Sequence, residues 1–353
     1  MTAPAVSIVM PVRDGERFLQ EAIDSILAQS FADFELIAID DGSRDSTPAI
    51  LAEAARRDPR IVIVSKGQIG FAAALNLGVA ASRAPLIARF DADDIALPDR
   101  LALQVEAMQR EPALGLLGGF AEVIDESGRT LEFRKPPVSH ERLLLVLLRN
   151  DPFIHSAVMF RADLARALGG YRAAIEVAED YDLWLRMAER TRIANLPETL
   201  VRYRVHRKSQ TGRKEVRMAF SARLARRAAA ERRAGRPDPI DGLTTPPDWG
   251  AIPADSFFAL DARDFRLLQY ADPVIAKSLD PSAIDPAVFD GLAPRLDHRE
   301  RRLAQRALLH LLRRDDRPSW LSRARLLGLM IWLHPARAAK LLALEITRHQ
   351  LKR

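Results

Sequence analysis

Short apolar runs alternate with helix-like segments throughout the first ninety residues of this chain. The apolar runs, which are typical of buried strands, lie at residues 6–11, 34–39, 61–64 and 86–90. The segments with apolar residues on one helical face lie at residues 16–28, 46–57 and 70–81. This repetition predicts an α/β fold with a mostly parallel sheet, right-handed crossovers and helices on both faces. Ligands bind beyond the carboxyl ends of strands in such a sheet, so the residues after each strand are candidates for function.

The pattern becomes less regular after residue 94. We expect strands at 114–124, 130–133 and 153–160, the first two forming a hairpin, and we expect helices at 98–110, 139–149 and 179–190. Asp14 is available to cap the first helix, and Pro48 fits the first turn of the second.

Three regions follow from the composition of the 353 residues. Residues 1–212 form the expected α/β domain. Residues 213–248 hold a basic helix followed by a linker. The linker, residues 235–248, contains four prolines and two glycines. Residues 249–353 show helical patterns without strand signals, which predicts a C-terminal α-helical region.

Cysteine is absent, which excludes a disulfide framework, a thiolate metal site and a cysteine nucleophile. A bound metal would therefore have oxygen or imidazole ligands. No apolar run approaches the roughly 18–20 residues of a membrane span, and the N-terminal residues lack the pattern of a signal peptide. We expect a cytoplasmic protein.

The formal net charge of +6 is unevenly distributed. Residues 1–201 hold 30 acidic and 22 basic side chains, whereas residues 202–238 hold 13 basic and 3 acidic ones, and residues 299–353 hold 14 and 4. Basic blocks indicate an anionic partner surface. Stacking aromatics are sparse there, which argues against nucleic acid. The Trp-containing apolar stretch within 321–351 is flanked by arginines, so these basic helices either lie on an anionic membrane surface or pack on the α/β domain or a partner.

Two acidic clusters follow strands of the predicted sheet. Asp40 and Asp41 end the second strand, and Asp91, Asp93 and Asp94 follow the fourth. Carboxylates gathered at one sheet edge repel each other unless a cation or donor-rich ligand is bound. Oxygen ligands favour Mg²⁺ or Mn²⁺, which also bind polyphosphates. The simpler alternative for Asp40 and Asp41 is a turn before the next helix.

Other phosphate-binding patterns are missing from the sequence. Residues 11–15 read PVRDG, which is neither the glycine-rich fingerprint of a dinucleotide-binding domain nor a phosphate-binding loop with Lys-Ser/Thr. The same residues also lack the glycine-rich, Lys/Arg-containing loop that a sugar nucleotidyltransferase needs.

An ordered set of motifs resembles the family 2 inverting glycosyltransferases, which have a GT-A fold. The set covers residues 5–210 and comprises SIVMPVR from Ser7, DDGSRDST from Asp40, Lys66, Gly70 and Asn76, RFDADDI from Arg89, Pro98, Arg100-Leu101, and Glu179-Asp180 before Trp184. The chain departs from the family pattern at Arg13-Asp14, where a Tyr/Asn-type pair is commoner. Residues 215–353 lie outside the resemblance.

The resemblance implies a nucleotide-sugar site at the sheet edge. Pro11, Arg13 and Asp41 would contact the base and ribose, and Lys66 would touch the nucleotide unless it is simply solvated. Asp91 would face the ribose and Asp93 would bind the metal, with Asp94 next in line. His206 would lie near the metal and diphosphate, or else be an exposed histidine of a basic tract.

The resemblance also implies the catalytic pair. Asp180, with Glu179 beside it, would be the general base that deprotonates the acceptor hydroxyl. The alternative is that both acids only stabilise the helix that they begin. His155 fits a core position or an acceptor pocket equally well, and core packing is favoured for Trp184.

We therefore expect a metal-dependent inverting glycosyltransferase with Mg²⁺ or Mn²⁺ as cofactor. It would transfer sugar from a nucleotide-diphosphate sugar to a hydroxyl of a glycan or lipid-linked acceptor, in exopolysaccharide, capsule or lipopolysaccharide assembly, at the inner face of the cell membrane. The alternative is a catalytically inactive GT-A scaffold subunit of a polysaccharide-assembly complex.

Overall fold

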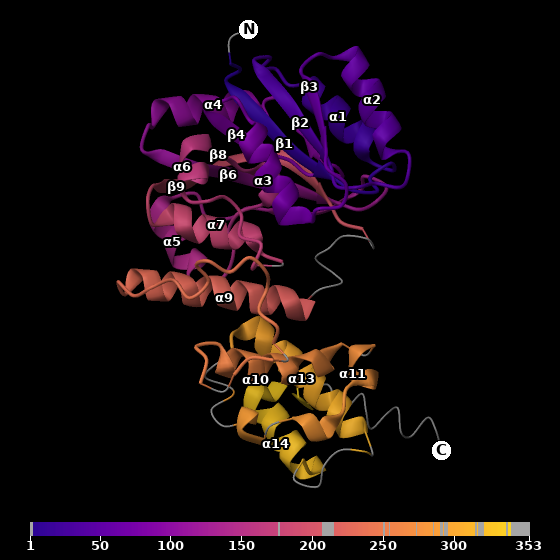
Figure 1. Ribbon diagram of the computed structural model, residues 1–353, viewed down its shortest axis with the longest axis vertical. Helices are drawn as coiled ribbons and strands as arrows, with labels where there is room; N and C mark the ends of the chain where they lie inside the picture. The colour runs from indigo at the N-terminus through magenta and orange to yellow at the C-terminus, as the bar shows by residue number, and fades with distance from the viewer. Residues whose placement is uncertain are drawn as a thin grey trace. The chain divides into compact units, whose positions relative to one another are not determined.

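The computed structural model describes two compact units of the chain (Figure 1). The first comprises Met1–Arg213 with Leu224–Thr245, and the second comprises Lys214–Arg223 with Pro246–Arg353. The residues that the structure describes are 3–175, 177–206, 215–249, 251–253, 255–272, 274–284, 286–289, 292, 296–314, 316, 321–336 and 338–339.

The described strands of the first unit form one sheet in the order β3-β2-β1-β4-β8-β6-β9-β5, with β7 paired to β6. The strands are β1 (Val6–Val12), β2 (Phe34–Asp40), β3 (Ile61–Ser65), β4 (Leu86–Arg89), β5 (Ile95–Ala96), β6 (Leu114–Ile124), β7 (Thr130–Arg134), β8 (Met159–Arg161) and β9 (Arg192–Arg204). β1 to β4 are parallel neighbours, as predicted, whereas β8 pairs with β4 and β6 in the antiparallel sense. The sheet is therefore mixed beyond β4.

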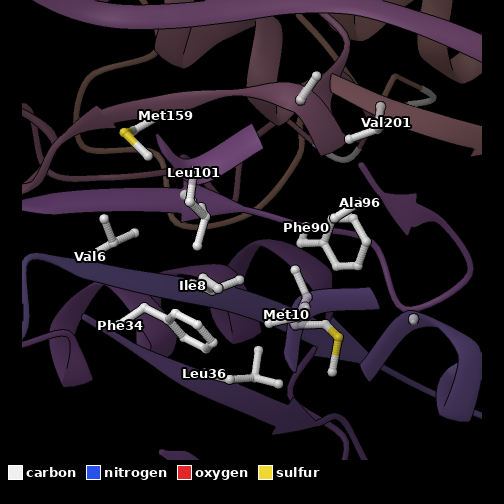
Figure 2. Close-up of a cluster of buried hydrophobic side chains, with 14 of the residues drawn as sticks. Val6, Ile8, Met10, Phe34, Leu36, Phe90, Ala96, Leu101, Met159 and Val201 are labelled. Atoms are coloured by element: carbon white, nitrogen blue, oxygen red, sulfur yellow. The ribbon is translucent and has the colours of Figure 1, made fainter. Parts of the chain in front are cut away.

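Helices cover both faces of this sheet, as expected. They are α1 (Leu19–Leu27), α2 (Thr47–Arg57), α3 (Phe71–Ala81), α4 (Arg100–Arg110), α5 (His140–Leu147), α6 (Ala162–Ala167) and α7 (Glu179–Ala188). Side chains of α1, α2 and α4 pack against one face of β1 and β2, which carries Ile8, Met10 and Leu36 (Figure 2). Because side chains alternate along a strand, Val9 and Ile39 point to the other face.

That other face receives α3. A Cβ placed on Gly78 would lie only 2.4 Å from Cγ1 of Val9 and 2.9 Å from Cδ1 of Ile39. The missing side chain of Gly78 therefore allows α3 to approach β1 and β2 closely, which fixes the loop between β3 and α3 at the carboxyl edge of the sheet.

Two local predictions were wrong, and one long strand was missed. Asp14 does not cap α1: it has a positive φ of 49°, and its Oδ1 accepts a hydrogen bond from the backbone N–H of Arg44 at 2.8 Å. The segment 153–160 is not one strand, because His155–Ala157 form a 3₁₀ turn before β8. The 13-residue strand β9 was not predicted at all.

The second unit is helical over its described residues, as predicted for the C-terminal region. Its helices are the start of α9 (Glu215–Arg233), α10 (Ala259–Leu268), α11 (Ile275–Ser278), α13 (His298–Arg313) and α14 (Arg323–Leu333). Leu303, Leu308 and Met330 belong to its apolar core. Among the residues that the structure describes, none forms a helix with the length and hydropathy needed to span a membrane.

Candidate active site

The acidic turn Asp91–Asp94 follows β4, in the middle of the sheet. The backbone N–H of Asp94 donates to the carbonyl of Asp91 at 3.3 Å, which folds the three carboxylates back on one another. One oxygen from each of Asp91, Asp93 and Asp94 lies within 4.8 Å of the others. This is the spacing that one shared cation could bridge.

The end of β9 supplies the partners of this turn. Nε2 of His206 lies 2.8 Å from Oδ2 of Asp93, so the structure brings this predicted pair together. The backbone N–H of Arg204 donates to Oδ1 of Asp94 at 2.7 Å, and Nε of Arg204 donates to the carbonyl of Asp93 at 2.9 Å. The unpredicted strand β9 is therefore the element that positions His206 and shapes the turn.

Burial and mutual repulsion act on the carboxylates of the turn. Burial and the neighbouring carboxylates raise the pKa of Asp94 well above its ordinary value, and burial raises the pKa of Asp91. Oδ2 of Asp94 is buried and has no hydrogen-bond partner among the described residues. Oxygen and imidazole donors around an orphaned carboxylate oxygen fit a hard divalent cation such as Mg²⁺ or Mn²⁺.

Arg89, the last residue of β4, carries the positive charge beneath the turn. Its side chain is 2% exposed and forms an ion pair with Asp91. Burial is the largest single influence and would lower the pKa of Arg89, but the charge of Asp91, its hydrogen bond and other nearby groups together raise it. The charge of Arg89 also acts on Asp180 and Glu179, so this buried cation influences both acidic groups of the site.

Glu179 and Asp180 begin α7. Ala178, just before them, is left-handed with φ of 84°, and this turn brings the pair to the start of the helix. Oδ1 of Asp180 accepts from the N–H of Tyr181 at 2.7 Å. Burial and the charge of Asp180 raise the pKa of Glu179 to about 8, so Glu179 holds its proton at neutral pH. Of the two predicted catalytic acids, Asp180 is therefore the better candidate for a base, and its pKa is raised by burial.

Aromatic rings surround the base candidate. Trp184 is fully buried, and its ring lies 5.8 Å from those of both His155 and Phe160. This agrees with the core position favoured for Trp184. His155 lies against Asp180 and Tyr171, which places it at the site rather than in the general core.

The predicted nucleotide contacts lie along the ends of β1, β2 and β3. Pro11 is buried within β1, and Arg13 is exposed just beyond it. Oδ1 of Asp41 accepts from the N–H groups of Ile69 at 2.6 Å and Gly70 at 3.0 Å, so Asp41 also fixes the loop before α3. Lys66 is solvent-exposed, and the described structure does not bring it to the acidic turn.

Sequence reasoning gave no role to three groups of this site. Arg89 was seen only as part of a motif, although a basic residue at the end of an apolar strand is itself a signal. Tyr171 was not considered. Asp151, whose pKa burial and the charge of Asp180 raise well above its usual value, was also missed. Their proximity depends on the irregular half of the domain, where the periodicity is weak.

Comparison with known proteins agrees with the fold and the site. Residues 7–169 match the family described as Glycosyl transferase family 2. The O-antigen biosynthesis glycosyltransferase WbnJ of Escherichia coli is 35% identical over 210 residues, which are 58% of this chain and 81% of that protein. The amylovoran biosynthesis glycosyltransferase AmsE of Erwinia amylovora is 30% identical over 188 residues, 53% of this chain and 70% of that protein.

A solved structure of similar fold is that of residues 1–349 of Staphylococcus aureus TarS in complex with UDP-GlcNAc. It has a TM-score of 0.50 and 14% identity, covering 94% of this chain and 87% of that one. At this identity the likeness concerns the fold alone. The sequence matches and the arrangement of strands and acidic residues together show that the chain is a glycosyltransferase that belongs to family 2.

Proposed function

We propose that this glycosyltransferase moves a sugar, with inversion, from a nucleotide-diphosphate sugar to a hydroxyl of a glycan or lipid-linked acceptor. The observation that carries the proposal is that neighbouring residues contact both acidic groups: Oγ of Ser156 accepts the N–H of Asp91 at 2.9 Å, and Nδ1 of His155 lies 3.5 Å from Oδ2 of Asp180. Two acidic groups with different surroundings are thus held at one site, as a transfer reaction with a donor end and an acceptor end requires.

The donor end would be the strand-end rim. Pro11, Arg13 and Asp41 would contact base and ribose, and Lys66 would reach the nucleotide from β3. Asp91 and Asp93, with His206, would hold Mg²⁺ or Mn²⁺. When bound, such a cation supplies positive charge at the diphosphate leaving group.

The acceptor end would be Asp180. Inverting transfer needs a carboxylate that takes the proton of the acceptor hydroxyl while the oxygen attacks the anomeric carbon from the far side. A raised pKa makes Asp180 a stronger base than an exposed aspartate. The buried, protonated Glu179 cannot compete for this role at neutral pH, and it limits the negative charge next to Asp180.

The acceptor class is supported by relatives that are named for O-antigen and amylovoran biosynthesis. We also propose that the protein acts in polysaccharide assembly at the inner face of the cell membrane. Ile331 and Trp332 of α14 are 48% and 51% exposed, and Arg323 and Arg325 begin that helix. The part of the basic C-terminal segment beyond residue 339 lies outside the described residues.

The membrane part has its own test. Full-length protein and Trp332→Ala are sedimented with vesicles of phosphatidylglycerol, and with phosphatidylcholine vesicles as control. We expect the wild type to sediment with the anionic vesicles only, and less so after the substitution. Equal sedimentation of both proteins with both vesicles would reject binding through α14.

The catalytic part is tested by hydrolysis of UDP-, GDP- and dTDP-sugars in the presence of Mn²⁺. We expect turnover of at least one donor by the wild type and its loss in Asp180→Asn. Asp163→Asn is a matched control, because Asp163 also begins a helix and its Oδ1 accepts the N–H of the next residue at 2.8 Å. Equal activity of all three proteins would refute the assigned base, and no turnover of any donor would favour an inactive scaffold.

A further inference from the structure

The ring of His155 lies between Asp180 and Tyr171. Nδ1 of His155 is 3.5 Å from Oδ2 of Asp180, and Nε2 is 3.2 Å from the hydroxyl oxygen of Tyr171. The first separation is an ion-pair distance, longer than a good hydrogen bond, and contacts of this kind in active sites often tighten only in the substrate complex. The three side chains thus form one line that ends at the proposed base.

The position of this line is fixed from two sides. Asn76 of α3 holds the backbone of Tyr171: its Oδ1 accepts the N–H of Tyr171 at 2.8 Å and its Nδ2 donates to the carbonyl at 2.7 Å. From α7, Arg186 donates to the carbonyl of Gly170 at 2.7 Å. The ring of Trp184 packs against His155 at 5.8 Å and against Tyr171 at 6.4 Å. Neither ring is free to move away from the other.

The protonation states in this line follow from the surroundings. Burial and the charge of Arg89 lower the pKa of His155 well below its ordinary value, so the imidazole is neutral and carries one N–H. Burial raises the pKa of Tyr171, so its hydroxyl keeps the proton. If the imidazole proton were on Nε2, the lone pair of Nδ1 would face the carboxylate of Asp180, which is repulsive. With the proton on Nδ1, the tyrosine donates to Nε2 and the histidine N–H faces Asp180, so both contacts are favourable.

We propose that His155 is a positioning residue for the base: Tyr171 fixes its proton on Nδ1, and this N–H orients the carboxylate of Asp180 and stabilises its charged form. The inference rests on the proposed role of Asp180. Other charged groups face Asp180 as well. Arg89 favours the carboxylate form, whereas Asp91 opposes it. The charge of Asp180 in turn raises the pKa of its neighbours Glu179 and Asp151, which favours their neutral forms.

The proton position is measured by NMR of the seven histidine side chains in ¹⁵N-labelled full-length protein. The His155 signal is assigned by its loss in His155→Asn. We expect a neutral ring with the proton on Nδ1 from about pH 6 to 8, where free imidazole titrates. In Tyr171→Phe we expect a shift towards the Nε2–H form. A wild-type ring with its proton on Nε2, or a doubly protonated ring, would overturn the proposal.

The pH profile of donor hydrolysis distinguishes positioning from mere packing. A hydrogen bond to the charged form of an acid lowers its pKa, so losing the bond should move the acidic limb of the profile up by about one pH unit. We expect this shift in His155→Leu and a smaller one in Tyr171→Phe. His155→Asn places an amide N–H near the position that Nδ1 has in the wild type. The acidic limb of this variant should therefore lie close to that of the wild type.

Tyr181→Phe is the matched control, since it also removes a buried tyrosine hydroxyl, one that donates to the carbonyl of Leu147 at 2.5 Å. It should leave the limb unchanged. If His155→Leu does not fold, Tyr171→Phe carries the same test. An active wild type whose acidic limb moves in none of the variants would overturn the positioning role while the proposed function stands. Full activity of Asp180→Asn would instead overturn the proposed function, and the NMR result would still decide the proton position.

Discussion

The buried carboxyl of Glu179 should make the stability of the folded protein depend on pH. Its pKa rises from 4.5 to about 8 on folding. Between these values the folded protein holds a proton that the unfolded chain has lost, so stability falls as pH increases through this interval. At about 1.4 kcal/mol per pKa unit, the loss has a ceiling of about 5 kcal/mol. Glu179→Gln cannot ionise and should lack this slope.

The assay is urea unfolding of the wild type and Glu179→Gln at several pH values, in EDTA, followed by circular dichroism. Taking the difference in unfolding free energy at each pH cancels the contributions of all unchanged groups. We expect the unfolding free energy of Glu179→Gln, relative to that of the wild type, to increase steadily from about pH 5 to 8. Glu141→Gln is the control, because hydrogen bonds at the start of α5 lower the pKa of the exposed Glu141, and its effect is confined to acidic pH. Parallel curves for the wild type and Glu179→Gln would refute the reasoning.

Three further outcomes are expected. Gly78→Ala should lower the unfolding free energy by about 1–3 kcal/mol, measured by urea unfolding, because its Cβ would overlap Val9; an unchanged value would contradict the close approach of α3. UDP with Mn²⁺, at about 100 times the dissociation constant, should stabilise the wild type by about 2.7 kcal/mol in thermal shift and leave Asp93→Asn unaffected; an equal shift in both would exclude Asp93 from the site. Trp184→Ala should cost about 3–5 kcal/mol of stability, whereas a folded variant impaired only in KM would indicate an acceptor contact.

Much of the sheet could be predicted from the sequence. The strands β1, β2 and β4 are buried along their whole length, and β3 is a short run of mostly β-branched residues, so each leaves a clear apolar pattern. The strand β9 was missed because its residues, from Arg192 to Arg204, mix charges and a proline with apolar side chains and have no clean alternation. The segment 153–160 looked like a strand, but the 3₁₀ turn brings Oγ of Ser156 to the N–H of Asp91 at 2.9 Å. That tertiary hydrogen bond leaves no trace in local periodicity.

The candidate site was predictable where its residues share a motif. The acidic turn follows a strand and the Glu179–Asp180 pair begins a helix, and both motifs carry the family resemblance. The buried position of Arg89 and the line from Tyr171 to Asp180 depend on contacts between segments that are far apart in the sequence. Only the structure brings them together, because each residue taken alone is an ordinary arginine, tyrosine or histidine.

The central claim is that the rim with the acidic turn binds the donor while Asp180, at the same site, acts as the base. The most direct measurement is a crystal of the full chain soaked with UDP and Mn²⁺, with anomalous scattering recorded for manganese. We expect one manganese peak in contact with the carboxylate of Asp93 and the diphosphate, and the carboxylate of Asp180 directed towards the bound nucleotide. A bound nucleotide without manganese at Asp93, or an Asp180 carboxylate turned away from the nucleotide, would contradict the account.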